Sequence, residues 1–348
     1  MTIKAFKNHR VYKIICALAF CVLTVGLLSA VTDIFRNKSE DALSREYQEF
    51  PGDTFDVIFL GSSVMLNDVY PLQLYHDYGI ASYNLGCGSQ SVASSYYLAK
   101  LAIEQQKPEL IVFDCNMCQE GLVYSSEEKF HYVTDALSLA EKREMVTELV
   151  PKDSWINFFF EMNLYHDRWK ELGIRDFARP ECRTYGAKVH FVSHPLGEYV
   201  ITEEKAPLPE VSEEYLRKII RLCEENQVEL LLTVLPMNFS ARYDIYDRNE
   251  WQKYYNTIQD IADEAGIQYL NFMYHTEETG LDPAKDFEGD THLNGWGAPK
   301  MTDYLGKYLR QHYELPDVRE DSAYDFMAED YVKFVEYKDR LEAEQAGR

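Results

Sequence analysis

From residue 53 onward, short apolar stretches alternate with amphipathic stretches of helical length. Five apolar stretches are candidate strands, at 56–60, 82–85, 110–113, 229–235 and 268–271. Candidate helices lie between and after them, at 71–78, 92–106, 213–226, 249–265 and 296–311. This alternation is typical of a parallel sheet with helices on both faces. We therefore expect a three-layer α/β/α domain over residues 50–312, built on a doubly wound parallel sheet.

The N-terminus carries a separate signal. Residues 11–31 are almost wholly apolar, and about 20 such residues are enough to cross a bilayer. We take 1–13 as a basic flank and 14–35 as a transmembrane anchor. The flank contains Lys4, Lys7, Arg10 and Lys13. Positive flanks stay in the cytoplasm, so the rest of the chain is expected outside it, with a single pass through the cell membrane. A cleaved signal peptide ending near Ser29-Ala30 is the rival, although Leu28 fits its cleavage site poorly.

Charge and cysteine content argue against three classes of function: nucleic-acid binding, a four-cysteine zinc site and redox catalysis. The net charge of −23 argues against nucleic-acid binding, which needs a basic surface. The seven cysteines form no regular disulfide framework. Cys115 and Cys118 make a CxxC, but no second pair completes a four-cysteine zinc site. We interpret Cys115 and Cys118 as two partly buried thiols at a strand end. A redox motif is the less favoured interpretation.

Two regions lie outside the alternating pattern. Residues 120–209 interrupt it with helix-like pieces at 133–149 and 154–164, followed by an irregular stretch. An insertion leaving the carboxyl end of a strand is placed to form a lid or a wall for substrate. A packed helical extension without contact to substrate is the alternative. Residues 313–348 are acidic and amphipathic, and predict a C-terminal helix that packs on the domain.

Gly61-Ser62-Ser63 directly follows the first predicted strand. Ligands of open parallel sheets bind beyond the carboxyl ends of the strands, and a serine at a sharp strand-to-helix turn can expose its hydroxyl there. Ser63 is the candidate nucleophile, and Ser62 is the fallback. A serine that only caps a turn is the common alternative for such a motif.

His292 is the candidate general base for that serine. Asp290, two residues earlier, can hold the imidazole tautomer whose Nε2 faces the hydroxyl. Asn294 is expected to cap the helix that begins near Trp296.

Three groups are candidate donors to an oxyanion: the N–H groups of Ser63 and Gly88 and the side-chain amide of Asn116. Gly86 is an alternative to Gly88. Both glycines can instead serve only the tight turn after the second strand.

In order and spacing these pieces resemble the SGNH (GDSL-type) hydrolase family. Four blocks carry the resemblance, Gly-Ser-Ser at 61–63 and the stretches 82–91, 107–116 and 289–298. The resemblance implies a flavodoxin-like α/β fold, Ser63 as nucleophile, and Gly88 and Asn116 as oxyanion donors. The sequence departs from the family pattern in that Asp290 precedes His292 by two residues rather than three. Asp114 also stands where a glycine is usual, and Ser62 stands where an aspartate is usual.

The anchor and the Gly-Ser-Ser variant are similar to the membrane-tethered branch that includes the D-alanyl-lipoteichoic acid transfer protein and the alginate O-acetylation proteins. This resemblance implies a serine esterase or O-acyltransferase acting on acyl groups of a cell-envelope polysaccharide or teichoic-acid-like polymer. It implies no metal or organic cofactor, and it suggests a separate multi-spanning membrane acyltransferase as partner. The alternative from another class is a non-catalytic protein of the same fold that binds a polysaccharide or such a partner. Phosphate binding at Gly61-Ser62-Ser63 has less support, because no lysine follows the loop.

Overall fold

The computed structural model describes residues 9–36, 43–173, 176–177, 182–194, 202–237, 248–289 and 291–347 of the 348-residue chain. These residues form two compact units. One comprises residues 1–39 and 153–179, and the other comprises 40–152 and 180–348. The expected insertion at 120–209 is therefore divided between the two units.

The larger unit contains a five-stranded sheet in the order β2-β1-β3-β4-β5, and every pairing is parallel. The strands are β1 (Val57–Leu60), β2 (Ser82–Asn84), β3 (Leu110–Asp114), β4 (Glu229–Val234) and β5 (Gln268–Asn271). Every residue of β1, β2 and β3 is buried, as expected for strands covered on both faces. The predicted fold class and all five predicted strands are confirmed.

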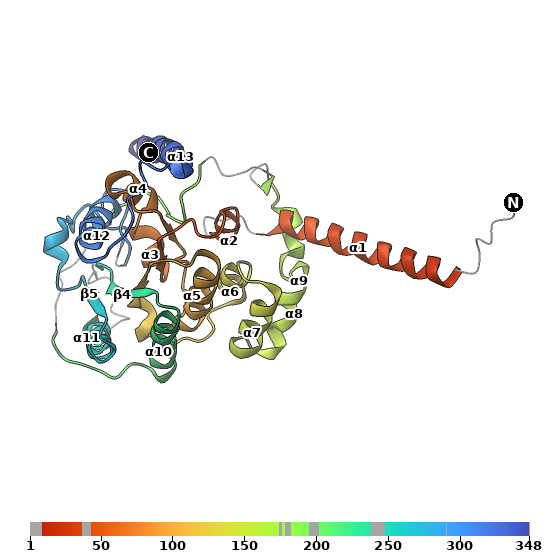
Figure 1. Cartoon of the computed structure of the whole chain (residues 1–348), viewed down its shortest axis with the longest axis horizontal. Coiled ribbons are helices and arrows are strands. Elements are labelled where there is room, and N and C mark those ends of the chain that lie inside the picture. The colour runs from red at the N-terminus through yellow and green to blue at the C-terminus, as the bar shows by residue number, and fades with distance from the viewer. Residues whose placement is uncertain are drawn as a thin grey trace. The chain divides into compact units, whose positions relative to one another are not determined.

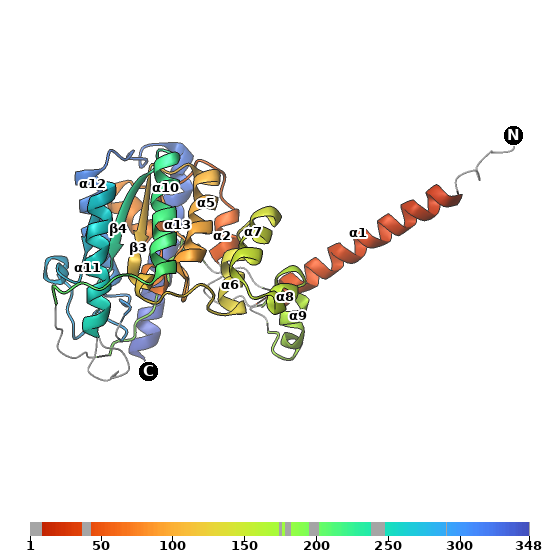
Figure 2. The same cartoon turned by 90° about the horizontal axis from the view of Figure 1, so that it is seen from below.

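Helices cover both faces of this sheet (Figures 1 and 2). One layer contains α5 (Val92–Gln106), α10 (Glu210–Glu225) and α11 (Arg248–Ala265), and α5 packs against α10. The opposite layer contains α4 (Pro71–Tyr78) and α12 (Ala298–His312), which pack against each other. Apolar residues four positions apart explain this placement, since Met301, Leu305 and Leu309 of α12 all face the core. All five helices were predicted, with ends shifted by up to three residues.

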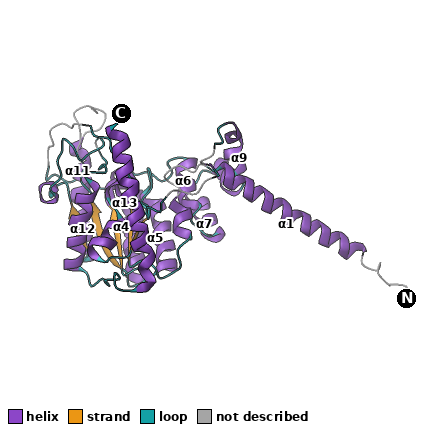
Figure 3. Cartoon of the chain, turned by 90° about the horizontal axis from the view of Figure 1, so that it is seen from above, coloured by secondary structure: helices purple, strands orange, loops and turns teal. Residues whose placement is uncertain are grey.

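The C-terminal helix, α13 (Asp325–Ala346), lies outside α4 (Figure 3). It buries Met327 and Phe334, and the Phe334 ring meets Tyr70 edge-on at 5.4 Å between centroids. The apolar spacing of the C-terminal stretch had predicted this packing on the domain.

The prediction of one helix over residues 133–149 is wrong. The structure has two, α6 (Glu127–Thr134) and α7 (Leu139–Leu149). Ser138 starts α7 with a capping box: its hydroxyl accepts the N–H of Glu141, and the Glu141 carboxylate accepts the N–H of Ser138. A Ser-x-x-Glu sequence is a helix-start signal, and here it breaks the apparent continuity of the apolar pattern.

The smaller unit contains the long helix α1 (His9–Phe35) and several short helices from the inserted segment. These are α8 (Trp155–Phe159), α9 (Met162–Tyr165) and the 3₁₀ helix η3 (His166–Lys170). Residues 154–164, predicted as one helical piece, therefore form two. Within α1, Val11–Phe35 is by length and composition a candidate membrane span, with a mean hydropathy of 2.7.

Candidate active site

Ser63 is placed by a tight passage between the ends of β1 and β3. Gly61 has φ +156, and a Cβ on it would lie 2.8 Å from Cβ of Asp114. Only glycine lets the chain leave β1 this close to β3. Ser62 then caps α3 (Ser63–Asp68), because its hydroxyl accepts the N–H of Val64 at 3.4 Å. Ser62 is thus buried in a capping role, and Ser63 opens the helix with a partly exposed side chain.

Ser63 and His292 come together in the structure. Nε2 of His292 lies 2.8 Å from Oγ of Ser63, although 229 positions separate the two residues in sequence. Both side chains are partly exposed, so a substrate can reach them. This is the geometry in which an imidazole can take the proton of a serine hydroxyl.

The loop that carries His292 is held from several sides. Phe287 and Leu293 form an antiparallel bridge, and the N–H of Glu288 donates to the carbonyl of His292 at 2.8 Å. The N–H of Leu293 donates to Oδ1 of Asp68 at 2.9 Å. Since Asp68 is the last residue of α3, this bond ties the histidine loop to the helix that begins with the serine.

Asp68 itself is completely buried, and burial raises its pKa well above the usual range of a carboxyl group. The carboxyl can therefore hold its proton while Oδ1 accepts the N–H of Leu293. We describe Asp68 as a positioning residue for His292. Its place five residues after Ser63 gave no sequence signal, because its partner lies 225 positions away.

His292 is held in its neutral form. Burial lowers its pKa to about 4; nearby His190 and Lys188 act in the same direction, and Glu288 opposes the shift. A neutral imidazole is the form that can act as a base at neutral pH.

Glu288 and His190 form a pair next to the catalytic candidates. Oε2 of Glu288 lies 2.7 Å from Nε2 of His190, and this contact lowers the pKa of Glu288. His190 comes from the last part of the insertion, whose backbone also meets the histidine loop: the N–H of Gly295 donates to the carbonyl of His190 at 2.6 Å. The segment around residue 190 thus forms a wall beside His292. Sequence reasoning missed both residues, and neither stands in a recognisable motif.

Asp290, the predicted orienting carboxylate, lies outside the described residues, so its role stays a prediction. Asn294, two residues after His292, accepts the N–H groups of Trp296 and Gly297 through Oδ1. It thus caps the turn that leads into α12, whose first residue is Ala298 rather than Trp296.

The two glycines considered as oxyanion donors, Gly86 and Gly88, differ in whether their N–H group already has a partner among the described residues. The N–H of Gly86 donates to Oδ1 of Asn84 at 2.9 Å and is used within its own turn. This argues against Gly86 as the alternative donor. Gly88 is partly exposed, and a Cβ placed on it would lie 2.9 Å from Nζ of Lys129. The N–H groups of Gly88 and Ser63 stay predicted donors.

Asn116 follows β3 in the 3₁₀ helix η1 (Cys115–Gln119) and is buried. Its amide nitrogen donates to Sδ of Met237 at 2.7 Å and to the hydroxyl of Tyr255 at 3.4 Å. Its Oδ1 accepts from Oγ of Ser62 at 3.4 Å. Asn116 therefore lies beside the Gly-Ser-Ser turn, and donation to an oxyanion requires its amide to rotate.

Asp114 has a structural role in place of the glycine usual at that position. Its Oδ1 accepts the N–H of Leu235 at 3.1 Å, which joins the ends of β3 and β4. Burial raises the pKa of Asp114 to about 7.

The two cysteines of the CxxC are free thiols. Cys115 and Cys118 are fully buried at the end of β3, more deeply than the sequence suggested. Burial raises the pKa of the Cys115 thiol well above its usual range. A buried thiol of raised pKa is a poor nucleophile, which favours the structural interpretation.

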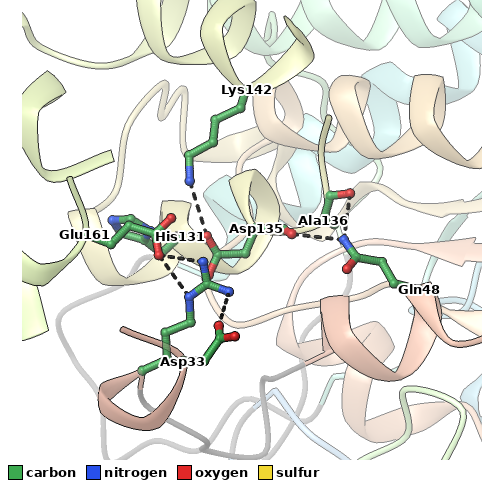
Figure 4. Close-up of polar contacts among 8 residues, drawn as sticks. Asp33, Gln48, His131, Asp135, Ala136, Lys142 and Glu161 are labelled. Atoms are coloured by element: carbon green, nitrogen blue, oxygen red, sulfur yellow. Dashed lines mark hydrogen bonds and ion pairs between the residues drawn. The ribbon is translucent and has the colours of Figure 1, made fainter. Parts of the chain in front are cut away.

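Metal-ligating side chains also occur near α6. Nδ1 of His131 lies 3.4 Å from Oδ1 of Asp135, but the same oxygen lies 3.4 Å from Nζ of Lys142 (Figure 4). The side chain of Gln48 donates to the carbonyls of Asp135 and Ala136. Because a lysine already neutralises the carboxylate, we assign no metal to this pair.

No family model and no curated protein matches the chain. Solved structures do match it. A GDSL-like lipase from Bacteroides thetaiotaomicron is 12% identical, with a TM-score of 0.42, over 80% of this chain and 100% of that one. An acetyl xylan esterase is 13% identical, with a TM-score of 0.37, over 73% of this chain and 98% of that one. Because the identity is so low, these matches do not identify the reaction of this chain.

Proposed function

We propose that the chain is a serine esterase or O-acyltransferase that works through an acyl-enzyme, with Ser63 as nucleophile and His292 as general base. The observation that carries the proposal is the 2.8 Å contact between Oγ of Ser63 and Nε2 of His292. The lowered pKa of His292 supports it, since the imidazole is then free to accept a proton. Asp290 is proposed as the orienting carboxylate.

The reaction has two steps. His292 takes the proton of Ser63 as the hydroxyl attacks the ester carbonyl, and an oxyanion forms that Ser63 N–H, Gly88 N–H and Asn116 are proposed to stabilise. His292 then gives the proton to the departing alcohol, which leaves an acyl group on Ser63. In the second step His292 deprotonates water or an acceptor hydroxyl, which attacks the acyl group. The bond between the acyl group and Oγ of Ser63 then breaks, His292 returns the proton to Oγ, and the acid or the acylated acceptor leaves.

The proposed substrates are acyl esters of a cell-envelope glycopolymer, and a separate membrane acyltransferase is the proposed partner. The apolar helix α1 supports this location, because as an uncleaved anchor it would hold the site at the membrane surface. A binding protein of the same fold is the competing proposal. It has no physical need of a serine and a neutral histidine in contact.

The test measures hydrolysis of p-nitrophenyl acetate by the full chain in detergent, with labelling by a fluorophosphonate probe. Ser63→Ala and His292→Gln should each lower turnover at least 100-fold while circular dichroism stays unchanged. The control is His275→Gln, which removes a surface imidazole paired with Glu278 and should leave turnover unchanged. If the wild type neither turns over nor takes up the probe, the binding protein becomes the better account.

A further inference from the structure

The end of the candidate membrane helix α1 is bonded to the inserted segment 153–179. The guanidinium of Arg168 donates to the carbonyls of Phe35 and Arg36, at 2.7 and 2.6 Å. It also pairs with Asp176 at 2.9 Å. Carbonyls at a helix C-terminus lack partners within the helix and attract positive charge, so Arg168 caps α1.

A second contact holds the same end of α1. Nε of Arg36 donates to Oε2 of Glu161 at 2.9 Å, and Arg36 also lies 3.5 Å from Asp33 (Figure 4). The Glu161 side chain is only 12% exposed, so this pair is partly shielded from water. The two arginine contacts fix residues 153–179 beside the last turn of α1.

This segment exposes an unusual number of large apolar side chains. Outside α1, the described part of the chain has eight large apolar residues that are exposed, and five of them lie in the segment. They are Ile156, Phe159, Phe160, Trp169 and Phe177, each 46–65% exposed. So many exposed large apolar side chains in one short segment are unfavourable in water and indicate a contact surface.

The charge of the segment fits a lipid surface. Residues 153–179 carry five acidic and four basic side chains, whereas the whole chain has a net charge of −23. The segment is therefore close to neutral and is repelled little by anionic headgroups. Trp169 directly follows Arg168, which bonds the end of α1. Trp169 therefore lies in the part of the chain next to the end of α1, where a spanning helix leaves the hydrocarbon, and tryptophan is enriched at that depth.

We propose that residues 153–179 form a membrane-interface segment, whose aromatic side chains insert among the headgroups of the leaflet at the C-terminal end of α1. The proposal rests on the anchor in the proposed function, but not on the chemistry of Ser63. The chain would then contact the bilayer through two elements, one spanning it and one lying in its surface.

The test uses the full chain in phosphatidylcholine vesicles that contain brominated lipid, which quenches nearby tryptophan. Three variants carry a single tryptophan each. One retains Trp169, a second retains Trp296 of the α/β unit, and a third has all four native tryptophans changed to phenylalanine together with Leu18→Trp in α1.

We expect Trp169 to be quenched at least twice as strongly as Trp296, and more by lipid brominated near the headgroup than by lipid brominated near the chain end. The Leu18→Trp variant should show the opposite depth preference. If that variant is quenched and Trp169 is quenched no more than Trp296, the interface segment is refuted while the anchor stands. If the Leu18→Trp variant is not quenched, α1 does not span, and the proposal fails with it. Neither result bears on the serine mechanism.

Discussion

Replacing Asp68 by alanine should damage the protein far more than replacing it by asparagine. The carboxyl is fully buried, and its Oδ1 accepts the N–H of Leu293 at 2.9 Å. Since burial raises its pKa, the native group resembles a neutral acid. Asparagine has the same shape, carries no charge and keeps an oxygen for this bond. Alanine leaves a buried N–H without its acceptor.

The expected losses of stability and of activity follow from this difference between alanine and asparagine. An unsatisfied buried N–H costs about 1–3 kcal/mol, so Asp68→Ala should lower the free energy of unfolding by at least that amount. It also frees the loop that sets the 2.8 Å contact between His292 and Ser63. A misplacement of roughly 1 Å at such a contact can cost about 100-fold in rate. Asp68→Asn should stay within about 1 kcal/mol of the wild type at the acid end of the pH range, where the native carboxyl keeps its proton.

The pH dependence gives a sharper test of the same reasoning. Because folding raises the pKa of Asp68, the folded chain keeps a proton that the unfolded chain releases above pH of about 3.9. In that window the wild type loses stability as pH rises, by roughly 1.4 kcal/mol per pH unit, until pH passes the folded pKa. Asp68→Asn has no such titrating proton and does not lose stability in this way. The unfolding free energy of the variant minus that of the wild type should therefore increase as pH rises.

The assay is urea unfolding of the full chain in detergent at several pH values, with p-nitrophenyl acetate turnover measured on the same samples. Other titrating groups, including the nearby Asp114, are present in both proteins and largely cancel in the difference. Equal damage from the alanine and asparagine variants, or a difference that does not change with pH, would refute a protonated Asp68 that acts as an acceptor.

Four further outcomes are expected. Gly61→Ala should unfold at lower urea and lose most activity, because its Cβ would lie 2.8 Å from Cβ of Asp114; a fully active variant would contradict the tight passage. Ser62→Ala should cost about 1 kcal/mol of unfolding free energy through its lost cap, yet keep turnover within a few-fold; loss of fluorophosphonate labelling would instead make Ser62 the nucleophile. In the wild type, kcat/KM should decrease as the pH drops below about 4, because His292 must be neutral to act as base. This decrease is the acid limb of the pH profile. Glu288→Gln should move that limb to lower pH, since the lost negative charge no longer favours the imidazolium. An unchanged limb, or one moved to higher pH, would contradict this interaction of Glu288 with His292.

The periodic pattern of the chain was enough to predict the five strands that the structure describes and the five helices that cover the sheet. Strand and helix periods are local properties, read from neighbours a few positions apart. The same strand assignments placed the Gly61 turn and Asn116 at the carboxyl ends of β1 and β3, which are neighbours in the sheet. Their proximity followed from the topology of a parallel sheet. The histidine was predicted from residue chemistry and resemblance, and its contact with Ser63 spans 229 positions.

Local patterns also misled in places, as at Ser138, where a capping box splits a helix that apolar spacing alone had joined. The division of the insertion between two units could not be read locally either. It depends on Arg168 and Glu161 finding partners at the end of α1, more than 120 positions away.

The finer properties of the candidate site arise from burial and from contacts between distant segments. The acceptor role of Asp68, the lowered pKa of His292 and the pairing of Glu288 with His190 all depend on which groups lose water together. Desolvation and charge proximity are set by the packed chain, and residues far apart in sequence carry no mark of their future neighbours. Composition and periodicity thus determined the fold class, the apolar N-terminal helix and the residue types available for catalysis. Tertiary packing decided which serine opens α3 towards His292, which carboxyl groups hold the histidine loop, and which aromatic side chains stay exposed beside α1.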